Sequence, residues 1–159
     1  DRAAETFTSE PPMARATFRS DSALQEGFRS EVKLRDHRLT VDEPRGIGGG
    51  DNGPTPVELV LAALGTCQEI TYRAFATALG IPLDGVSVAV EGDIDFRGFF
   101  AIDPGVRPGF GALRVNVTLD SAAPQAEIDR LVEMVNSHCP VLDMLSSPVP
   151  ATLQTVVRR

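Results

Sequence analysis

The sequence predicts an α+β fold built on an antiparallel sheet. Several short segments alternate apolar or β-branched residues with polar ones, which is typical of strands. Two longer segments have the composition or the periodicity of helices. Along the chain the predicted elements follow the order βββ-α-ββ-α-β, which groups strands together as antiparallel folds do. A chain of 159 residues, 42% hydrophobic and 23% charged, is expected to form one globular domain.

Strand spacing dominates the first part of the chain. Residues 1–12 are polar with a pair of prolines, and we expect a loose tail before a single domain that spans 13–159. The segments MARATFRS, GFRSEVKL and HRLTVDEP predict a three-stranded antiparallel meander between Met13 and Pro44, with Arg35–His37 as a turn. The glycine-rich stretch from Arg45 to Pro56 predicts a loop. It lacks the GxxxxGK[ST] pattern of a phosphate-binding loop and does not open a βαβ unit.

A long helix is predicted over 57–80. Alanine and leucine dominate it, Thr55 is positioned to cap it, Pro56 suits its first position, and the charge of Glu58 suits its positive end. The run 59–64 is apolar all round, which indicates a helix buried on more than one side. We therefore expect a partner chain or a wrapping sheet to cover it.

Two further strands, a second helix and a last strand are predicted after it. The strands are VSVAVEGDIDF and ALRVNVTLD, separated by a loop over 97–109. The segment Pro124–Ser137 has one apolar stripe and predicts an amphipathic helix. Pro140 begins a short helical turn through Leu145, and PATLQTVVRR is predicted to be the final strand.

Charge and composition restrict the partners. A net charge of −7 argues against a nucleic-acid surface. No apolar run approaches the roughly 20 residues of a membrane span, and the first residues do not have the pattern of a signal peptide. Two cysteines fit a reduced compartment, so we expect a cytoplasmic protein. With two cysteines, two histidines and neither CxxC nor HxxxH, we expect no metal and no cofactor.

Both cysteines have a structural and a chemical interpretation. Cys67 lies inside the apolar helix, where it is either a small buried hydrophobe or a thiolate that needs a nearby cation. Cys139 precedes a proline, so its sulfur is expected near the unpaired N–H groups of a short helix, unless it serves as a cap between two helices. The adjacent His138 cannot face Cys139 on a helix, so a Cys–His pair would need His37 or another chain.

The segment GGGDNGPTPVELVLAALGTC, over 48–67, followed by HCPV at 138–141, resembles the OsmC/Ohr family of bacterial thiol peroxidases. The resemblance extends over about residues 13–159. It implies an intertwined homodimer in which antiparallel sheets from both chains wrap two long central helices. It also implies an antioxidant role in the response to oxidative stress.

The resemblance assigns roles to the two cysteines. Cys67 matches the peroxidatic cysteine, whose thiolate attacks an organic hydroperoxide, releases an alcohol and becomes a sulfenic acid. Cys139 matches the resolving cysteine, which condenses with Cys67 to a disulfide that an external dithiol reduces. The apolar surroundings of the helix favour organic hydroperoxides over hydrogen peroxide.

The family also uses an arginine from the early strands and a carboxylate near the start of the first long helix. Arg29 is the best match for the arginine and Arg19 the second, while Glu58 matches the carboxylate. The sequence has Pro56, Val57 and then Glu58 where the hydroperoxide-resistance branch has Pro-Glu, and one position turns a helical side chain by about 100°. The alternative for Glu58 is a charge that stabilises the helix end.

The loop Phe96–Phe110 resembles a less characterised branch of OsmC-like proteins. Its four phenylalanines and two arginines either line an entrance or cover a dimer, or its aromatic rings pack on the core. Two other functions are open for the chain: a non-catalytic module that binds a small ligand in the same cleft, and a reversible thiol redox sensor.

Overall fold

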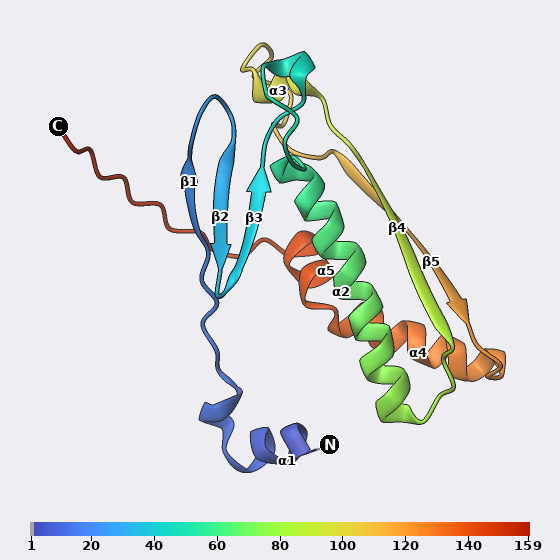
Figure 1. Ribbon diagram of the computed structural model, residues 1–159. Helices are drawn as coiled ribbons and strands as arrows, with labels where there is room; N and C mark the ends of the chain where they lie inside the picture. The colour runs from blue at the N-terminus through green and yellow to red at the C-terminus, as the bar shows by residue number, and fades with distance from the viewer. Residues whose placement is uncertain (1) are drawn as a thin grey trace. The chain divides into compact units, whose positions relative to one another are not determined.

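The computed structural model describes residues 2–159, with side chains from residue 4 (Figure 1). The chain divides into two compact units: the first ends at Leu61, and the second runs from Ala62 to Arg159. This boundary lies inside the long helix α2 (Pro56–Leu79). The single domain over 13–159 stays a prediction.

The first unit contains an antiparallel meander in the order β1-β2-β3, as predicted. Its strands are β1 (Asp21–Leu24), β2 (Ser30–Leu34) and β3 (His37–Val41). A two-residue turn joins β2 to β3, with Leu34 opposite His37 and Arg35 at φ 56°. Residues 2–9 form helix α1 (Arg2–Ser9) and Pro11–Ala14 form the 3-10 helix η1, where the sequence analysis expected a loose tail. Alanine and glutamate at its start favour helix.

The first strand lies further along the chain than predicted. The alternating segment at 13–20 has no regular strand, whereas Asp21 pairs with Lys33 and Leu24 with Ser30. The turn that follows sets this register, because the backbone N–H of Gln25 donates to the Arg29 carbonyl across 2.7 Å. Residues close to that turn are therefore the ones that lie opposite β2.

A buried carboxylate organises the glycine-rich loop, which contains the 3-10 helix η2 (Arg45–Ile47). Asp42 is only 1% exposed and follows directly after β3. Its carboxylate accepts hydrogen bonds from the backbone N–H groups of Glu43, Gly50 and Asn52 and from the Asn52 side chain. These bonds, the one from the Asn52 side chain above all, hold the pKa of Asp42 below its ordinary value. The loop is thus held by one anionic acceptor.

The second unit packs a long hairpin against helices (Figure 1). Besides most of α2, its elements are β4 (Gly85–Asp93), α3 (Phe96–Phe99), β5 (Ala112–Asp120), α4 (Gln125–His138) and α5 (Pro140–Ser146). The β4–β5 ladder runs from Gly85 opposite Asp120 to Asp93 opposite Ala112. Side chains alternate along both strands, so that valines and leucines face inward.

The core of this unit joins α2, α4 and the hairpin. Its buried members are Tyr72, Ala76, Ile81, Leu83, Leu131 and Val135. A Cβ at Gly65 would lie 3.4 Å from the Val90 side chain, so this glycine lets α2 approach β4 closely. Gly80 ends the helix at φ +68°, as the sequence predicted.

One face of α2 stays uncovered within the second unit. Ala63, Thr66 and Ala74 are exposed, and Ile70 retains 70% of its accessible surface. Within the second unit, the helix is therefore buried on one side only, whereas the sequence analysis expected burial on more than one side. Cover of the other side by a partner chain stays a prediction.

The prediction of a final strand over 150–159 is wrong. Residues 147–159 have no regular secondary structure, and Leu153, Val156 and Val157 are 94%, 76% and 74% exposed. A strand needs a neighbouring backbone to pair with. Within the described part of the chain, no strand pairs with this apolar segment.

None of the helices in residues 2–159 has both the length and the apolar content that a membrane crossing requires.

Candidate functional site

The two cysteines meet inside the second unit. Cys67 lies in the middle of α2, and Cys139 lies between α4 and α5. The Cys139 thiol donates to Cys67 Sγ across 3.3 Å, although 72 positions separate the two residues. Both are free thiols; Cys139 is 1% exposed and Cys67 is half-buried. The pair is thus reachable from solvent through Cys67 rather than through Cys139.

Helix packing produces this encounter. The buried Leu131 and Val135 of α4 share a core with Tyr72 and Ala76 of α2. The backbone N–H of Cys139 donates to the Val135 carbonyl and ends α4, and the next residue is the proline that begins α5. Cys139 is therefore held at the junction of two helices, against α2.

The electrostatics of the second unit favour the thiol form of Cys67. Burial is the largest effect and raises the pKa of Cys67 above its ordinary value, and the Cys139 thiol raises it further. A hydrogen bond from the backbone N–H of Val141, in the first turn of α5, opposes this, as does the Thr71 side chain. No cation of the second unit is among these groups, so a thiolate at neutral pH needs one from elsewhere.

The Cys139 side chain does not bind the N-terminus of α5. The sequence analysis expected Cys139 Sγ near the free N–H groups of this short helix, unless the residue served as a cap between two helices. Cys139 lies between α4 and α5 and makes no side-chain capping bond there. Its thiol donates to Cys67 Sγ instead, and the N–H of Val141 lowers the pKa of Cys67. Stabilisation of a Cys139 thiolate by the helix stays a prediction.

Within the second unit, His138 contacts residues other than the two cysteines, and His37 belongs to the first unit. The His138 ring packs on Phe75, with centroids 5.3 Å apart, and its Nδ1 lies 2.8 Å from the Met134 carbonyl oxygen. His37 begins β3 in the first unit. Among residues 2–159, no three His, Cys, Asp or Glu side chains are grouped to hold a metal ion.

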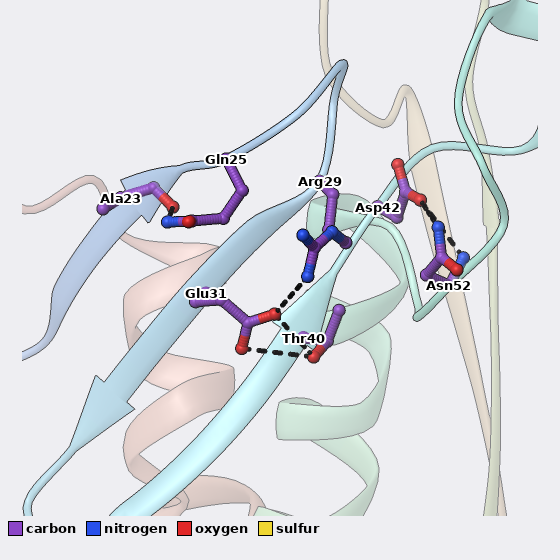
Figure 2. A network of polar contacts seen from close by, with 7 residues as sticks. All are labelled: Ala23, Gln25, Arg29, Glu31, Thr40, Asp42 and Asn52. Atoms are coloured by element: carbon purple, nitrogen blue, oxygen red, sulfur yellow. Dashed lines mark hydrogen bonds and ion pairs between the residues drawn. The ribbon is translucent and has the colours of Figure 1, made fainter.

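The predicted arginines belong to the first unit, and each has a carboxylate partner there. Arg29 Nη1 lies 3.1 Å from Glu31 Oε1, and Thr40 donates to the same carboxylate oxygen across 3.1 Å (Figure 2). Arg19 pairs with Asp21 at 2.6 Å in a well-exposed position. The activating role of Arg29, with Arg19 as the second choice, stays a prediction.

Glu58 forms a capping box with Thr55. Glu58 Oε2 accepts the backbone N–H of Thr55 at 2.7 Å, and Thr55 Oγ1 accepts the backbone N–H of Glu58 at 3.2 Å. These bonds hold the pKa of Glu58 below its ordinary value. The helix-end role that the sequence offered for Glu58 is therefore present, while a role toward an arginine stays a prediction.

The second unit contains two cavities whose linings include close sequence neighbours of the cysteines. The first, of about 390 Å³, is lined by Leu64, Arg107, Phe110, Gly111, Ala112, Leu113, Val115, Leu142, Leu145 and Ser146. The second, of about 330 Å³, is lined by Gln68, Tyr72, Val115, Val117, Leu119, Val132, Asn136 and Leu142. Leu64 lies one turn before Cys67, Gln68 follows it directly, and Leu142 lies three positions after Cys139. Neither cysteine itself lines either cavity.

The loop between β4 and β5 divides its aromatic residues between two environments. Phe110 lines the first cavity, and a role of the loop as an entrance stays a prediction. Phe96, Phe99 and Phe100 remain 45%, 62% and 52% exposed and pack on one another, with the Phe99 and Phe100 rings 5.0 Å apart. Within the second unit, these three rings are not part of the buried core.

Sequence reasoning missed two residues that line the cavities. Arg107 was noted only as one of the loop arginines, and Gln68, 2% exposed and facing the second cavity, was not noted at all. The signal for Gln68 was available, because a polar residue beside Cys67 interrupts an apolar helix. No comparable pattern distinguishes Arg107, whose position depends on the path of a loop.

Solved structures show the same fold at low sequence identity. An OsmC-like protein from Mycoplasma pneumoniae is 18% identical, with a TM-score of 0.72 over 84% of this chain and 89% of that one. An organic hydroperoxide resistance protein OsmC from Legionella pneumophila is 22% identical, with a TM-score of 0.63 over 83% and 90%. One from Elizabethkingia anophelis, bound to thiocyanate, is 19% identical, with a TM-score of 0.64 over 84% and 91%.

Sequence comparison establishes the family. No curated protein sequence matches the chain. A family model described as OsmC-like protein, however, matches residues 48–154. The matched region includes both cysteines, both cavities and most of the second unit, and it is well over half of the chain. The resemblance drawn from the cysteine motifs is therefore confirmed, and the chain belongs to the family of OsmC-like proteins.

Proposed function

We propose that the protein is a cysteine-based thiol peroxidase that reduces organic hydroperoxides to alcohols. The observation that supports this most is the 3.3 Å approach of the Cys67 and Cys139 sulfur atoms. A buried cysteine that served only packing would not need a second thiol at that distance. Membership of the OsmC-like family supports a redox role, and two of the similar structures are named organic hydroperoxide resistance proteins.

The reaction begins at Cys67, which is the more exposed of the two thiols. Its thiolate attacks the distal oxygen of the hydroperoxide, the O–O bond breaks, and the alkoxide takes up a proton to leave as an alcohol. Cys67 is left as a sulfenic acid, oxidised by two electrons. The N–H of Val141 stabilises the thiolate before attack.

Cys139 then resolves the intermediate. Its sulfur attacks the sulfenic sulfur, hydroxide leaves and is protonated to water, and a Cys67–Cys139 disulfide forms. A 3.3 Å separation of the sulfur atoms requires only a small movement to reach bonding distance. An external dithiol returns both cysteines to thiols by exchange and leaves as its own disulfide. The cycle uses no metal and no bound cofactor.

The proposed assembly is a homodimer in a reducing compartment such as the cytoplasm. Three features support it: the uncovered face of α2 around Ile70, the unpaired apolar segment at 149–157, and the exposed rings of the β4–β5 loop. Each of these leaves apolar surface that a second copy would remove from water. In that assembly Arg29, held by Glu31 and supported by Glu58, is proposed to supply the cation that Cys67 needs.

The decisive experiment exposes the reduced protein to one equivalent of an alkyl hydroperoxide without reductant, followed by intact mass measurement. We expect a loss of two hydrogens per chain and a peptide that joins Cys67 to Cys139. If both thiols stay free and alkylatable, the peroxidase proposal fails.

A second candidate is a non-catalytic module that binds a small ligand beside unreactive thiols. The raised pKa of Cys67 and the two cavities favour it. Steady-state hydroperoxide consumption with a dithiol separates the two, because the module would show none. A thiol sensor would form the disulfide once but would not turn over.

A further inference from the structure

We propose that Asn52 is a modification site, where deamidation of the side-chain amide opens the glycine-rich loop between β3 and α2 irreversibly. The modification turns one hydrogen-bonded pair, Asn52 and Asp42, into two carboxylates that face each other. The inference does not rest on the proposed peroxidase activity, because every group in it belongs to the first unit.

The Asn52 side chain binds a buried carboxylate. Asp42 is 1% exposed, and its Oδ2 accepts Asn52 Nδ2 across 2.7 Å (Figure 2). The same oxygen accepts the backbone N–H groups of Gly50 at 3.1 Å and of Asn52 at 3.2 Å, while Oδ1 accepts that of Glu43 at 2.8 Å. Within the described part of the first unit, Asp42 forms no ion pair. Neutral N–H donors alone therefore hold this anion in the loop.

The rest of the loop lies tightly against the end of β3. The backbone N–H of Asp42 donates to the Pro54 carbonyl across 3.3 Å. A Cβ at Gly53 would lie 2.2 Å from the Thr40 carbonyl oxygen, so no other residue fits there. Helix α2 begins two residues after Pro54. The bonds at Asp42 thus fix the path of the chain from β3 into α2.

The sequence at Asn52 favours deamidation. It is the only asparagine of the chain that precedes a glycine, and glycine has no side chain to shield its backbone nitrogen. The Gly53 nitrogen attacks Asn52 Cγ, the bond from Cγ to Nδ2 breaks, and Nδ2 leaves as ammonia with the Gly53 amide proton. Water then opens the cyclic imide at either carbonyl, which leaves aspartate or isoaspartate. Because the ammonia is lost, the amide does not form again.

The closed loop opposes the first step of this reaction. Hydrogen bonds to Asp42 hold both the side-chain and the backbone nitrogen of Asn52, and Gly53 packs on the backbone of Thr40. Ring closure requires the Gly53 nitrogen to turn toward Asn52 Cγ, which these contacts prevent until the loop opens. Deamidation therefore records an opening of the loop.

Deamidation also keeps the loop from closing again. It removes a donor and places a carboxylate oxygen where Asn52 Nδ2 now lies, 2.7 Å from Asp42 Oδ2. Two carboxylates at that distance do not both ionise without a large loss of free energy, above all where one of them is buried. Isoaspartate adds a backbone carbon as well, which the close contact at Gly53 does not accommodate. The modified loop thus stays open.

The first test compares Asn52→Ala with Asn52→Asp. Asn52→Ala loses one hydrogen bond and should lower the midpoint of thermal unfolding by about 2 to 4 °C. Asn52→Asp also opposes two charges and should lower the midpoint by about 4 to 10 °C at neutral pH. Trypsin cleavage after Arg45, inside the loop, should be about 10-fold faster or more in Asn52→Asp than in the wild type.

Two further variants isolate the effect of charge. Adding Asp42→Asn to Asn52→Asp should restore part of the lost midpoint, because one carboxylate and one amide then face each other again. Asn116→Asp is the matched control, since it makes the same substitution at an exposed position on β5 and should change the midpoint little. Equal midpoints in Asn52→Ala and Asn52→Asp, or no recovery in the double variant, would overturn the opposed-charge mechanism.

The second test follows the modification itself. The wild-type protein is kept at mildly alkaline pH and physiological temperature, and peptide mapping measures aspartate and isoaspartate at each asparagine. Asn52 should convert ahead of Asn116 and Asn136, and about 5-fold faster or more in Asp42→Ala, where the loop opens more often. The converted fraction should show the faster cleavage after Arg45. An unmodified Asn52 in both proteins, or conversion that leaves this cleavage unchanged, would overturn the proposal.

Discussion

The two units differ in whether their candidate site residues already have charged or hydrogen-bonding partners. In the first unit the charged candidates are already satisfied: Arg29 by Glu31, and Glu58 by the backbone of Thr55. In the second unit Cys67 and Cys139 have chiefly each other, and burial raises the pKa of Cys67. The unit with the proposed nucleophile, Cys67, has no cation among the groups that act on its pKa, and the proposed cation lies in the other unit. This difference teaches that activation of Cys67, rather than placement of the sulfur atoms, is what the charged residues are expected to supply.

The largest effect is expected from the thiol pair itself. Cys67→Ser should lower hydroperoxide turnover by on the order of 1,000-fold or more, because a hydroxyl cannot replace the thiolate nucleophile. Consumption of hydroperoxide with a dithiol measures this directly.

Cys139→Ser is the matched variant. It should still consume one equivalent of hydroperoxide and form a trappable sulfenic acid at Cys67, without a disulfide. Full activity in Cys67→Ser, or loss of the first equivalent in Cys139→Ser, would contradict the division of roles between the two cysteines.

The second effect concerns the stability of the oxidised protein. A disulfide between residues 72 positions apart should raise the free energy of unfolding by about 4 kcal/mol through the entropy of the unfolded chain. Guanidinium denaturation of the oxidised and reduced forms measures the difference. Oxidation that leaves the midpoint unchanged, or lowers it, would show that the disulfide strains the α2–α5 junction.

The sequence predicted the elements that depend on neighbouring residues, and it failed for those that depend on pairing between distant segments. The ends of α2 followed from Thr55, Pro56 and Gly80, because capping depends on neighbours in sequence. The meander order was also correct, yet β1 was displaced, because the turn closed by Gln25 and Arg29 fixes its register. A final strand depends on an edge to pair with, and the alternation in 150–159 carries no information on whether that edge exists.

The site divides in the same way. The motifs around Cys67 and Cys139 predicted which two residues to bring together, although their approach depends on the packing of α2 on α4. The sequence analysis expected the free N–H groups of the short helix beside Cys139, whereas the N–H of Val141 acts on the pKa of Cys67. The spacing of the motif does not encode how a side chain rotates about its backbone. Arg107 had no sequence signal, because its position depends on a loop.

The third effect tests the cation. If Arg29 stabilises the thiolate, Arg29→Ala should raise the pKa of Cys67 by about one unit or more. Below that pKa the thiolate fraction falls about tenfold for each unit of pH, so alkylation at neutral pH should slow by about tenfold. The rate of iodoacetamide alkylation against pH measures the shift.

Arg19→Ala serves as the control, because Arg19 is exposed and paired with Asp21. A curve that Arg29→Ala leaves in place would remove Arg29 from the site. A shift in Arg19→Ala alone would transfer the role to Arg19.

The smallest effect separates the two roles of Glu58. Thr55→Ala removes one half of the capping box and should lower the free energy of unfolding by about 1 kcal/mol. Glu58→Gln keeps an acceptor for the Thr55 N–H but removes the charge. Because the folded-state pKa of Glu58 is lowered, its charge stabilises the fold at neutral pH, and that stability is lost as pH falls below the ordinary glutamate pKa toward the lowered one. Glu58→Gln should therefore lower the free energy of unfolding more at pH 7 than at pH 4, as urea denaturation measures.

If Glu58 also supports Arg29, Glu58→Gln should slow alkylation of Cys67 at neutral pH while Thr55→Ala does not. Equal alkylation rates in the two variants would leave Glu58 with the helix end alone.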